Sequence, residues 1–173
     1  MPYDYLIEEI KKKVGICLGL LSRTDSFLLE RRVSERSVSH KLAEYLQQQF
    51  PDWNVDCEYN LKGLGTKQLE GIQECDEQKK TDRVLPDIIV HRRNTDDNLL
   101  VIEVKHQNDD LCDLKKLELF TSPSGQFRYK FGLFIKFDSP ESPTLRWFED
   151  GSETLRREQA HGSGETKGAK TLD

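Results

Sequence analysis

The amino-acid sequence predicts an α/β fold, with a mixed four- to five-stranded sheet flanked by helices. Short apolar runs rich in Val, Ile and Phe are bounded by turn residues, which is typical of strands. Other segments repeat apolar residues every three or four positions, which is typical of amphipathic helices. These segments alternate along residues 34–149, and a strand–helix–strand crossover after a hairpin makes a mixed sheet. With 173 residues, the chain fits one domain with its own core.

Residues 1–33 are predicted to form a helical addition that packs on this core. The first part has apolar residues at helical spacing, at Leu6, Ile7, Ile10 and Val14. Gly15 and Gly19 weaken the helical pattern that follows, because glycine disfavours a helix interior. The structure of residues 14–33 is therefore left open, apart from a short helix that could begin at Phe27.

The core domain, residues 34–149, is predicted to begin with a helix that extends to Phe50. Ser34 is a suitable N-cap and Pro51 a suitable stop, and one stripe is apolar: Val38, Leu42, Leu46 and Phe50. Residues 53–59 then alternate large or apolar side chains with polar ones, which predicts the first strand. The long polar connection 61–84 is typical of a substrate-facing flap or a mobile loop.

The next segment predicts a β-hairpin. Its strands are residues 86–91 and 99–105, and residues 94–98 supply the turn. Paired positions in an antiparallel hairpin have a constant index sum, and a turn centred near Thr95 gives a sum of 190. Asp87 and Glu103 should therefore lie opposite one another.

Two facing carboxylates need a compensating charge. Opposed residues have Cβ atoms about 4.5–5.5 Å apart, and like charges at that range destabilise the pair unless a cation or proton is shared. Mg²⁺ takes oxygen ligands, often one or two carboxylates with water. The strand period places Lys105 on the face of Glu103, so we expect Asp87, Glu103 and Lys105 together at one sheet edge. The ammonium could hold or deprotonate a water, or offset charge in a transition state.

The remaining elements complete the predicted sheet. Residues 111–120 have the spacing of a second amphipathic helix, and residues 127–137 read as a strand that becomes covered on both faces. Residues 144–148 are expected to add a short edge strand. Bulky apolar residues nearly vanish afterwards, which predicts a disordered tail over residues 150–173.

Pro86-Asp87 followed by Glu103-Val104-Lys105 resembles the motif of the PD-(D/E)xK nuclease superfamily. The resemblance covers residues 35–137 and includes the αβββαβ order of a restriction-endonuclease-like core. It implies a metal-dependent nuclease that hydrolyses phosphodiester bonds, with DNA as the expected substrate. It also implies that Asp87 and Glu103 bind Mg²⁺ or Mn²⁺, and that Lys105 positions the hydrolytic water and stabilises the transition state.

The superfamily also carries a glutamate on the helix before the sheet, and Glu35 is the first candidate for it here. Glu35 lies on the apolar stripe of its helix, so the resemblance implies a third metal-binding and catalytic carboxylate at this position. The alternative role of Glu35 is a favourable interaction with the helix dipole. Glu44 is the competing candidate, but it falls on the polar face of the same helix.

The charge composition limits how such a protein could contact nucleic acid. The formal net charge is −5, whereas phosphate binding requires a positive surface, so the contact must be local. Lys115 and Lys116 are candidates, because the helix after the Glu-x-Lys strand should begin near the metal. Two other interpretations stay open: an inactive nuclease-like module that binds a protein or nucleic-acid partner, and an interaction domain with an accidental motif.

The sequence also bears on location and assembly. The four cysteines are widely separated and form no CxxC pair, so the sequence does not suggest a zinc site. We expect reduced thiols in a cytoplasmic protein. An apolar run of eight residues after Lys13 is too short for a membrane span, and no signal-peptide cleavage site follows it. We expect no membrane partner, and the oligomeric state is left open, with a homodimer among the alternatives.

Overall fold

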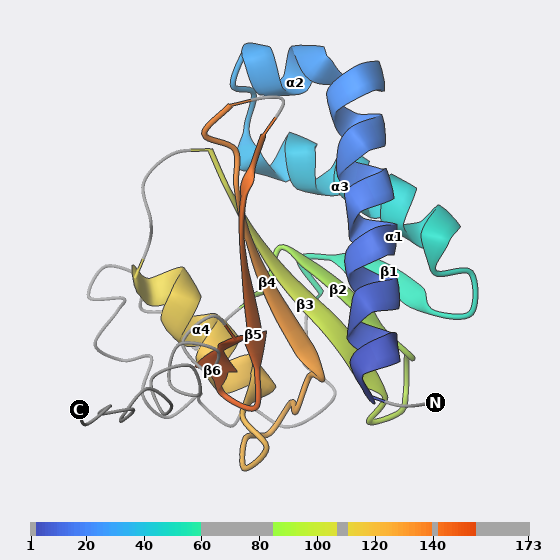
Figure 1. Cartoon of the computed structure of the whole chain (residues 1–173), viewed down its shortest axis with the longest axis vertical. Coiled ribbons are helices and arrows are strands. Elements are labelled where there is room, and N and C mark those ends of the chain that lie inside the picture. Colours follow the sequence, from blue (N-terminus) through green and yellow to red (C-terminus); the bar gives the residue numbers. More distant parts are fainter. Residues whose placement is uncertain (1–2, 60–84, 107–110, 140–141, 155–173) are drawn as a thin grey trace, which may run out of the picture.

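The structure is a computed structural model that describes residues 3–59, 85–106, 111–139 and 142–154 (Figure 1). Its helices are α1 (Tyr3–Thr24), α2 (Ser26–Glu30), α3 (Glu35–Gln49) and α4 (Leu111–Thr121). Its strands are β1 (Asn54–Cys57), β2 (Ile88–His91), β3 (Asn98–Lys105), β4 (Phe131–Lys136), β5 (Thr144–Glu149) and β6 (Ser152–Glu153). The predicted flap, residues 61–84, lies wholly within the undescribed residues 60–84. The end of the predicted tail, residues 155–173, is also undescribed.

One mixed sheet forms the centre of the fold, with the strand order β1-β2-β3-β4-β5-β6. The pair β3 and β4 is parallel, and the other neighbouring pairs are antiparallel. This arrangement follows from the chain, since α4 provides the crossover that two parallel strands require. The predicted α/β class with a mixed sheet flanked by helices is confirmed.

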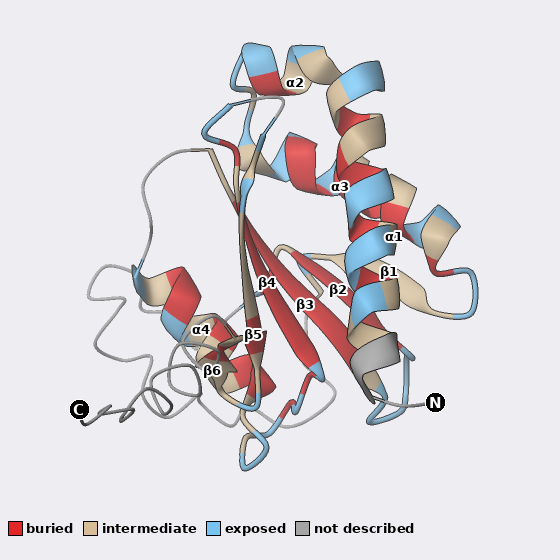
Figure 2. Ribbon diagram, viewed as in Figure 1, coloured by how far each residue is buried: buried red, intermediate tan, exposed pale blue. Residues whose placement is uncertain are grey.

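Helices cover both faces of this sheet (Figures 1 and 2). On one face, α1 and α3 pack against Leu100, Ile102 and Val104 of β3. On the other face, α4 packs in a second apolar cluster that includes Val101. The predicted alternation along this strand is therefore confirmed, and both faces of β3 are buried.

The first helix is longer than the sequence pattern indicates, because α1 continues through Gly15 and Gly19 to Thr24. Glycine in a helix interior costs about 1 kcal/mol relative to alanine. Burial offsets that cost, since five apolar side chains of α1 enter the core: Ile10, Val14, Cys17, Leu18 and Leu21. The short helix expected near Phe27 is present as α2.

The fourth strand is shorter than predicted, because β4 begins at Phe131 and not at residue 127. Arg128 has a φ of 48°, which breaks the extended conformation. Phe127 and Tyr129 are buried through contacts with Phe120 of α4, with ring centroids 5.3 and 6.0 Å away. The alternation of aromatic residues here reflects packing in a loop, so the strand assignment for residues 127–130 was wrong.

The sheet also extends beyond residue 149, where the sequence predicted the core to end. Ser152 and Glu153 form β6, which pairs with β5 and gives the sheet six strands in place of four or five. The side chain of Glu153 is nearly buried and forms an ion pair with Arg146, with 2.7 Å between the charged atoms. A two-residue strand has no sequence period, which explains why β6 was missed.

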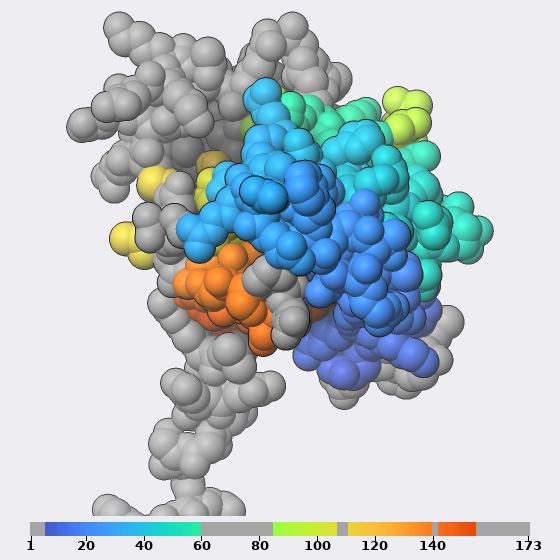
Figure 3. Space-filling model, turned by 90° about the horizontal axis from the view of Figure 1, so that it is seen from above, coloured from blue at the N-terminus to red at the C-terminus, as the bar shows by residue number. Residues whose placement is uncertain are grey.

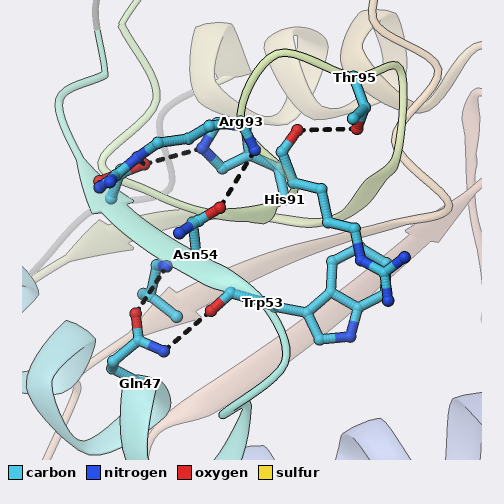
Figure 4. A network of polar contacts seen from close by, with 9 residues as sticks. Gln47, Trp53, Asn54, His91, Arg93 and Thr95 are labelled. Atoms are coloured by element: carbon cyan, nitrogen blue, oxygen red, sulfur yellow. Dashed lines mark hydrogen bonds and ion pairs between the residues drawn. The ribbon is translucent and has the colours of Figure 1, made fainter.

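Polar contacts fix the base of the β1–β2 pair, away from Asp87 (Figure 4). The buried His91 ring contacts Asp56 with 2.8 Å between Nε2 and Oδ2, and Arg93 also binds this carboxylate. The hydrogen bonds from Arg93 lower the pKa of Asp56, and the contact with His91 lowers it further. Burial acts in the opposite direction, but the pKa stays below its ordinary value. Gln47 at the end of α3 accepts a hydrogen bond from the Val55 amide, which joins the helix to β1.

No helix within the described ranges combines the length and apolarity needed to span a lipid bilayer.

Candidate active site

The register of the β2–β3 hairpin determines where the two candidate metal ligands lie. Ile88 pairs with Ile102 and Val90 pairs with Leu100, so the predicted index sum of 190 is confirmed. The next position in this register places Asp87 opposite Glu103. The Val104 amide donates a hydrogen bond of 2.8 Å to Oδ2 of Asp87, which holds the Asp87 carboxylate against β3.

Glu103 is an ionisable residue inside the protein. Its exposed fraction is 2%, and its Oε1 has no hydrogen-bond partner among the described residues. Burial and then the charge of Asp87 raise the pKa of Glu103 well above its ordinary value. Burial also raises the pKa of Asp87, although the Val104 hydrogen bond opposes this shift. Without a cation, the environment therefore favours proton uptake by these carboxyl groups.

The candidate site lies at the C-terminal end of β3, which is an interior strand of the sheet. β3 lies between β2 and β4, and Glu103 pairs with Phe134 of β4. The parallel pairing with β4 covers the second side of the hairpin, as the predicted strand–helix–strand crossover requires. In the described structure, Glu103 is therefore flanked by a neighbouring strand on each side.

Lys105 lies at that end and contacts two carboxylates. Its Nζ is 3.0 Å from Oδ2 of Asp113 and 3.5 Å from Oε2 of Glu35. Burial lowers the pKa of Lys105, but the hydrogen bond and charge of Asp113, together with the charges of Glu35 and Asp87, outweigh burial and raise it. The ammonium is therefore held in its charged form, which suits it to stabilising negative charge and not to accepting a proton from water.

Glu35 begins α3 directly after the N-cap Ser34, whose Oγ accepts a hydrogen bond from the Ser37 amide. The Glu35 carboxylate reaches the end of β3, because its Oε1 also accepts a 3.2 Å hydrogen bond from the His106 amide. Val38, Leu42 and Leu46 of the same stripe are buried, as predicted. The stripe therefore faces the sheet and brings Glu35 to the candidate site.

Glu44, the alternative helix carboxylate, lies on the exposed side of α3. It pairs with Lys41 at 2.6 Å and with His40 at 3.4 Å. No contact of Glu44 with Asp87, Glu103 or Lys105 occurs among the interactions of the described residues.

Asp113 is a member of the site that the sequence analysis missed. It lies in the first turn of α4 and is 2% exposed. Its Oδ1 is 2.6 Å from Nζ of Lys116, and its Oδ2 contacts Lys105. The sequence does contain a signal for the burial of Asp113. This residue precedes Leu117 and Phe120 by four and seven residues, so it lies on the apolar stripe of its helix.

The two lysines proposed for nucleic-acid contact occupy different environments. Lys115 lies on the surface and pairs with Glu118 at 3.2 Å. Lys116 is partly buried and points toward the carboxylates; burial lowers its pKa, but the charge of Glu103 and the hydrogen bond to Asp113 raise it overall. Lys116 therefore compensates charge inside the site instead of presenting a free cation to a ligand.

These residues form one cluster, which we call the carboxylate–lysine cluster: Glu35, Asp87, Glu103, Lys105, Asp113 and Lys116. Four carboxyl groups and two ammonium groups interact within it. When all six are ionised, two negative charges remain without a positive partner inside the cluster. One divalent cation would balance them.

The donor set suits a hard cation, because carboxylate oxygens are the ligands that Mg²⁺ and Mn²⁺ prefer. The buried Oε1 of Glu103 lacks a hydrogen bond within the described structure and is available as a ligand atom. In the described part of the chain, no group of three or more His, Cys, Asp or Glu side chains is arranged to hold a metal by itself. Magnesium needs only one or two carboxylates with water, so Asp87 and Glu103 fit this requirement.

No protein-family model matches the sequence, and a search of curated proteins finds no match to it.

The site allows one test that separates the two helix carboxylates. If the chain has the nuclease activity that the motif resemblance implies, we expect Glu35→Gln to lower its rate of DNA cleavage about tenfold, because the glutamine keeps an acceptor for the His106 amide but loses the charge beside Lys105. Glu44→Gln should leave the rate unchanged, because its partners are surface residues. Cleavage rates and Mn²⁺ affinities of the two variants check this, and a defect confined to Glu44→Gln would contradict the helix orientation.

Proposed function

We propose that the chain is a metal-dependent nuclease of restriction-endonuclease-like fold that hydrolyses phosphodiester bonds in DNA. The observation that carries this proposal is the carboxylate–lysine cluster, which gathers four carboxyl groups and two ammonium groups at the end of β3, so that full ionisation would leave two negative charges without positive partners. A buried cluster of this kind is costly unless its charges are compensated. Strongly perturbed ionisable groups with specific charge partners are also typical of catalytic sites.

The order of elements supports the fold part of the proposal. The sequence α3-β1-β2-β3-α4-β4 has the αβββαβ order of the superfamily that the Asp87, Glu103 and Lys105 motif resembles. In this order, the hairpin delivers two carboxylates, and the helices before and after it deliver Glu35 and Asp113 to the same end of the sheet.

Asp87 and Glu103 would hold the metal, with Glu35 assisting. When bound, Mg²⁺ or Mn²⁺ would polarise a phosphoryl oxygen and lower the pKa of a water. The hydrogen bond from the Val104 amide fixes the position of Asp87 for this role. The burial of Glu103 under α4 excludes bulk water from one side of the site, which strengthens electrostatic interactions there.

Lys105 would stabilise the charge that develops on the phosphate in the transition state, and would help to hold the attacking water. Its raised pKa keeps the ammonium charged, so proton removal from water is not assigned to this residue. Asp113 and Glu35 hold Lys105 in place through contacts of 3.0 and 3.5 Å. Asp113 is therefore a positioning residue in this account, and Lys116 offsets the charge of Glu103.

A plasmid-nicking assay tests the proposed function. We expect the wild type to convert supercoiled DNA to open-circular or linear forms with Mg²⁺ or Mn²⁺, and to be inactive with EDTA. Calcium should bind and support little cleavage. Asp87→Asn serves as the inactive control, because it replaces the carboxylate that the Val104 amide holds. Metal binding without cleavage would favour the alternative of an inactive nuclease-like module that binds a partner.

A further inference from the structure

A pocket of about 490 Å³ lies between the first half of α3 and the ends of β1 and β2. Its lining includes Arg36, Ser37, His40, Lys41, Glu58 and Asp87. Figure 3 views the molecule from above, where α2 and the start of α3, in light blue, face the viewer. Because Asp87 belongs both to this pocket and to the carboxylate–lysine cluster, the pocket adjoins the candidate metal site.

The cationic side chains of the pocket are available to a ligand. Arg36 is 81% exposed and pairs with Glu58 at 2.6 Å, while His40 and Lys41 share Glu44 as a partner. Exposed ion pairs of this kind contribute little stability, so a phosphate could replace the carboxylate partners at small cost. Arg36 and His40 are one helical turn apart, which places them along the same side of α3.

The pocket differs from the surface of α4 in this respect. Of the two lysines on α4 that were predicted to contact nucleic acid, Lys116 is paired with Asp113 inside the cluster. Lys115 alone lies on the surface. With a net charge of −5, the chain has to bind phosphates through a local group of cations. Arg36 and Lys41 supply two such cations, and they line the same pocket as Asp87.

We propose that this pocket binds the phosphodiester backbone of the DNA strand next to the phosphate that is cleaved, so that the strand runs over α3 and not over α4. This inference rests on the proposed nuclease function. Arg36 and Lys41 contact backbone phosphates, and the Ser37 hydroxyl, which is 2.9 Å from Oγ of Ser34, lies at the pocket wall. Contacts to the backbone position the strand without reading its sequence.

The test compares two double variants that remove the same positive charge. Arg36→Ala/Lys41→Ala changes the pocket, whereas Lys11→Ala/Arg92→Ala removes two cations that also have surface partners, Glu8 and Asp97. Affinity for a fluorescent single-stranded DNA is measured by anisotropy in Ca²⁺ over a series of salt concentrations. Thermal melting and Ca²⁺ titration verify that each variant is folded and retains the metal site.

We expect the pocket variant to bind DNA roughly 10–100-fold more weakly than the wild type, at about tenfold for each cation that no longer meets a phosphate. The slope of log affinity against log salt should also become shallower, by about 0.7 for each such cation on single-stranded DNA. The control variant should remain close to the wild type in both quantities.

Equal affinities for the pocket and control variants, with a wild type that binds and cuts DNA, would overturn the pocket assignment and leave the nuclease proposal intact. A wild type that binds Ca²⁺ but no DNA would overturn both. A weaker affinity confined to the control variant would place the strand elsewhere on the surface and would also overturn the assignment.

Discussion

Replacing Lys105 with methionine is expected to reduce the rate of DNA cleavage by about 10²–10³, the usual effect of removing one well-placed charge stabiliser. Methionine keeps an unbranched apolar stem at this partly buried position but loses the ammonium that contacts Asp113 and Glu35. Metal affinity should be largely retained, because Lys105 is not a ligand. The measurement is single-turnover nicking at saturating Mn²⁺, together with calorimetric titration of Mn²⁺.

Lys115→Met is the matched control, because it removes the same charge from the surface of α4. It should cleave at the wild-type rate. Cleavage by Lys105→Met at the wild-type rate would remove Lys105 from the mechanism, whereas equal defects in both variants would indicate a loss of general electrostatic attraction.

The second large effect concerns the stability of the metal-free protein, which should depend on Glu103. Burial raises the pKa of Glu103 above its unfolded value of 4.5, so the folded state binds this proton more tightly. Binding of this proton stabilises the folded state. The stabilisation is fully present below pH 4.5 and is lost as the pH rises through the pKa of Glu103 in the folded protein. Glu103→Gln, which needs no proton, should therefore be more stable than the metal-free wild type at neutral pH and should lose less stability between about pH 5 and 7.

Metal should reverse the order of the two proteins. A ligand at 100 times its Kd stabilises the folded state by about 2.7 kcal/mol, which corresponds to about 5–10 °C in Tm for a chain of this size. Saturating Mg²⁺ or Mn²⁺ should therefore raise the Tm of the wild type by that amount and that of Glu103→Gln much less. Glu44→Gln should behave like the wild type. A wild-type Tm that does not change on addition of millimolar Mg²⁺ or Mn²⁺ would contradict the metal site.

The hairpin and its register could be predicted because they depend on local sequence. A polar turn between two apolar runs fixes which residues face one another, so the pairing of Ile88 with Ile102 followed from the position of the turn. The phase of α3 was equally accessible, because one apolar stripe determines which side faces the sheet, and Glu35 lies on that stripe.

The burial of the site could not be predicted in the same way. The predicted strand–helix–strand crossover implied that β3 and β4 lie in one sheet, but it did not reveal that Glu103 would be only 2% exposed there. The role of Asp113 depends on how α4 is placed over the sheet, so its contact with Lys105 emerged only from the tertiary structure. The aromatic residues before Phe131 resembled a strand because packing in a loop can produce the same alternation.

Calorimetric titration of Mn²⁺ onto the metal-free wild type and onto Asp87→Asn tests the central claim, that the carboxylate–lysine cluster has a place for one divalent cation. The predicted result is one Mn²⁺ bound per wild-type chain and a titration at least about tenfold weaker for Asp87→Asn. Binding of equal strength in both proteins, or no binding to the wild type, would contradict the claim.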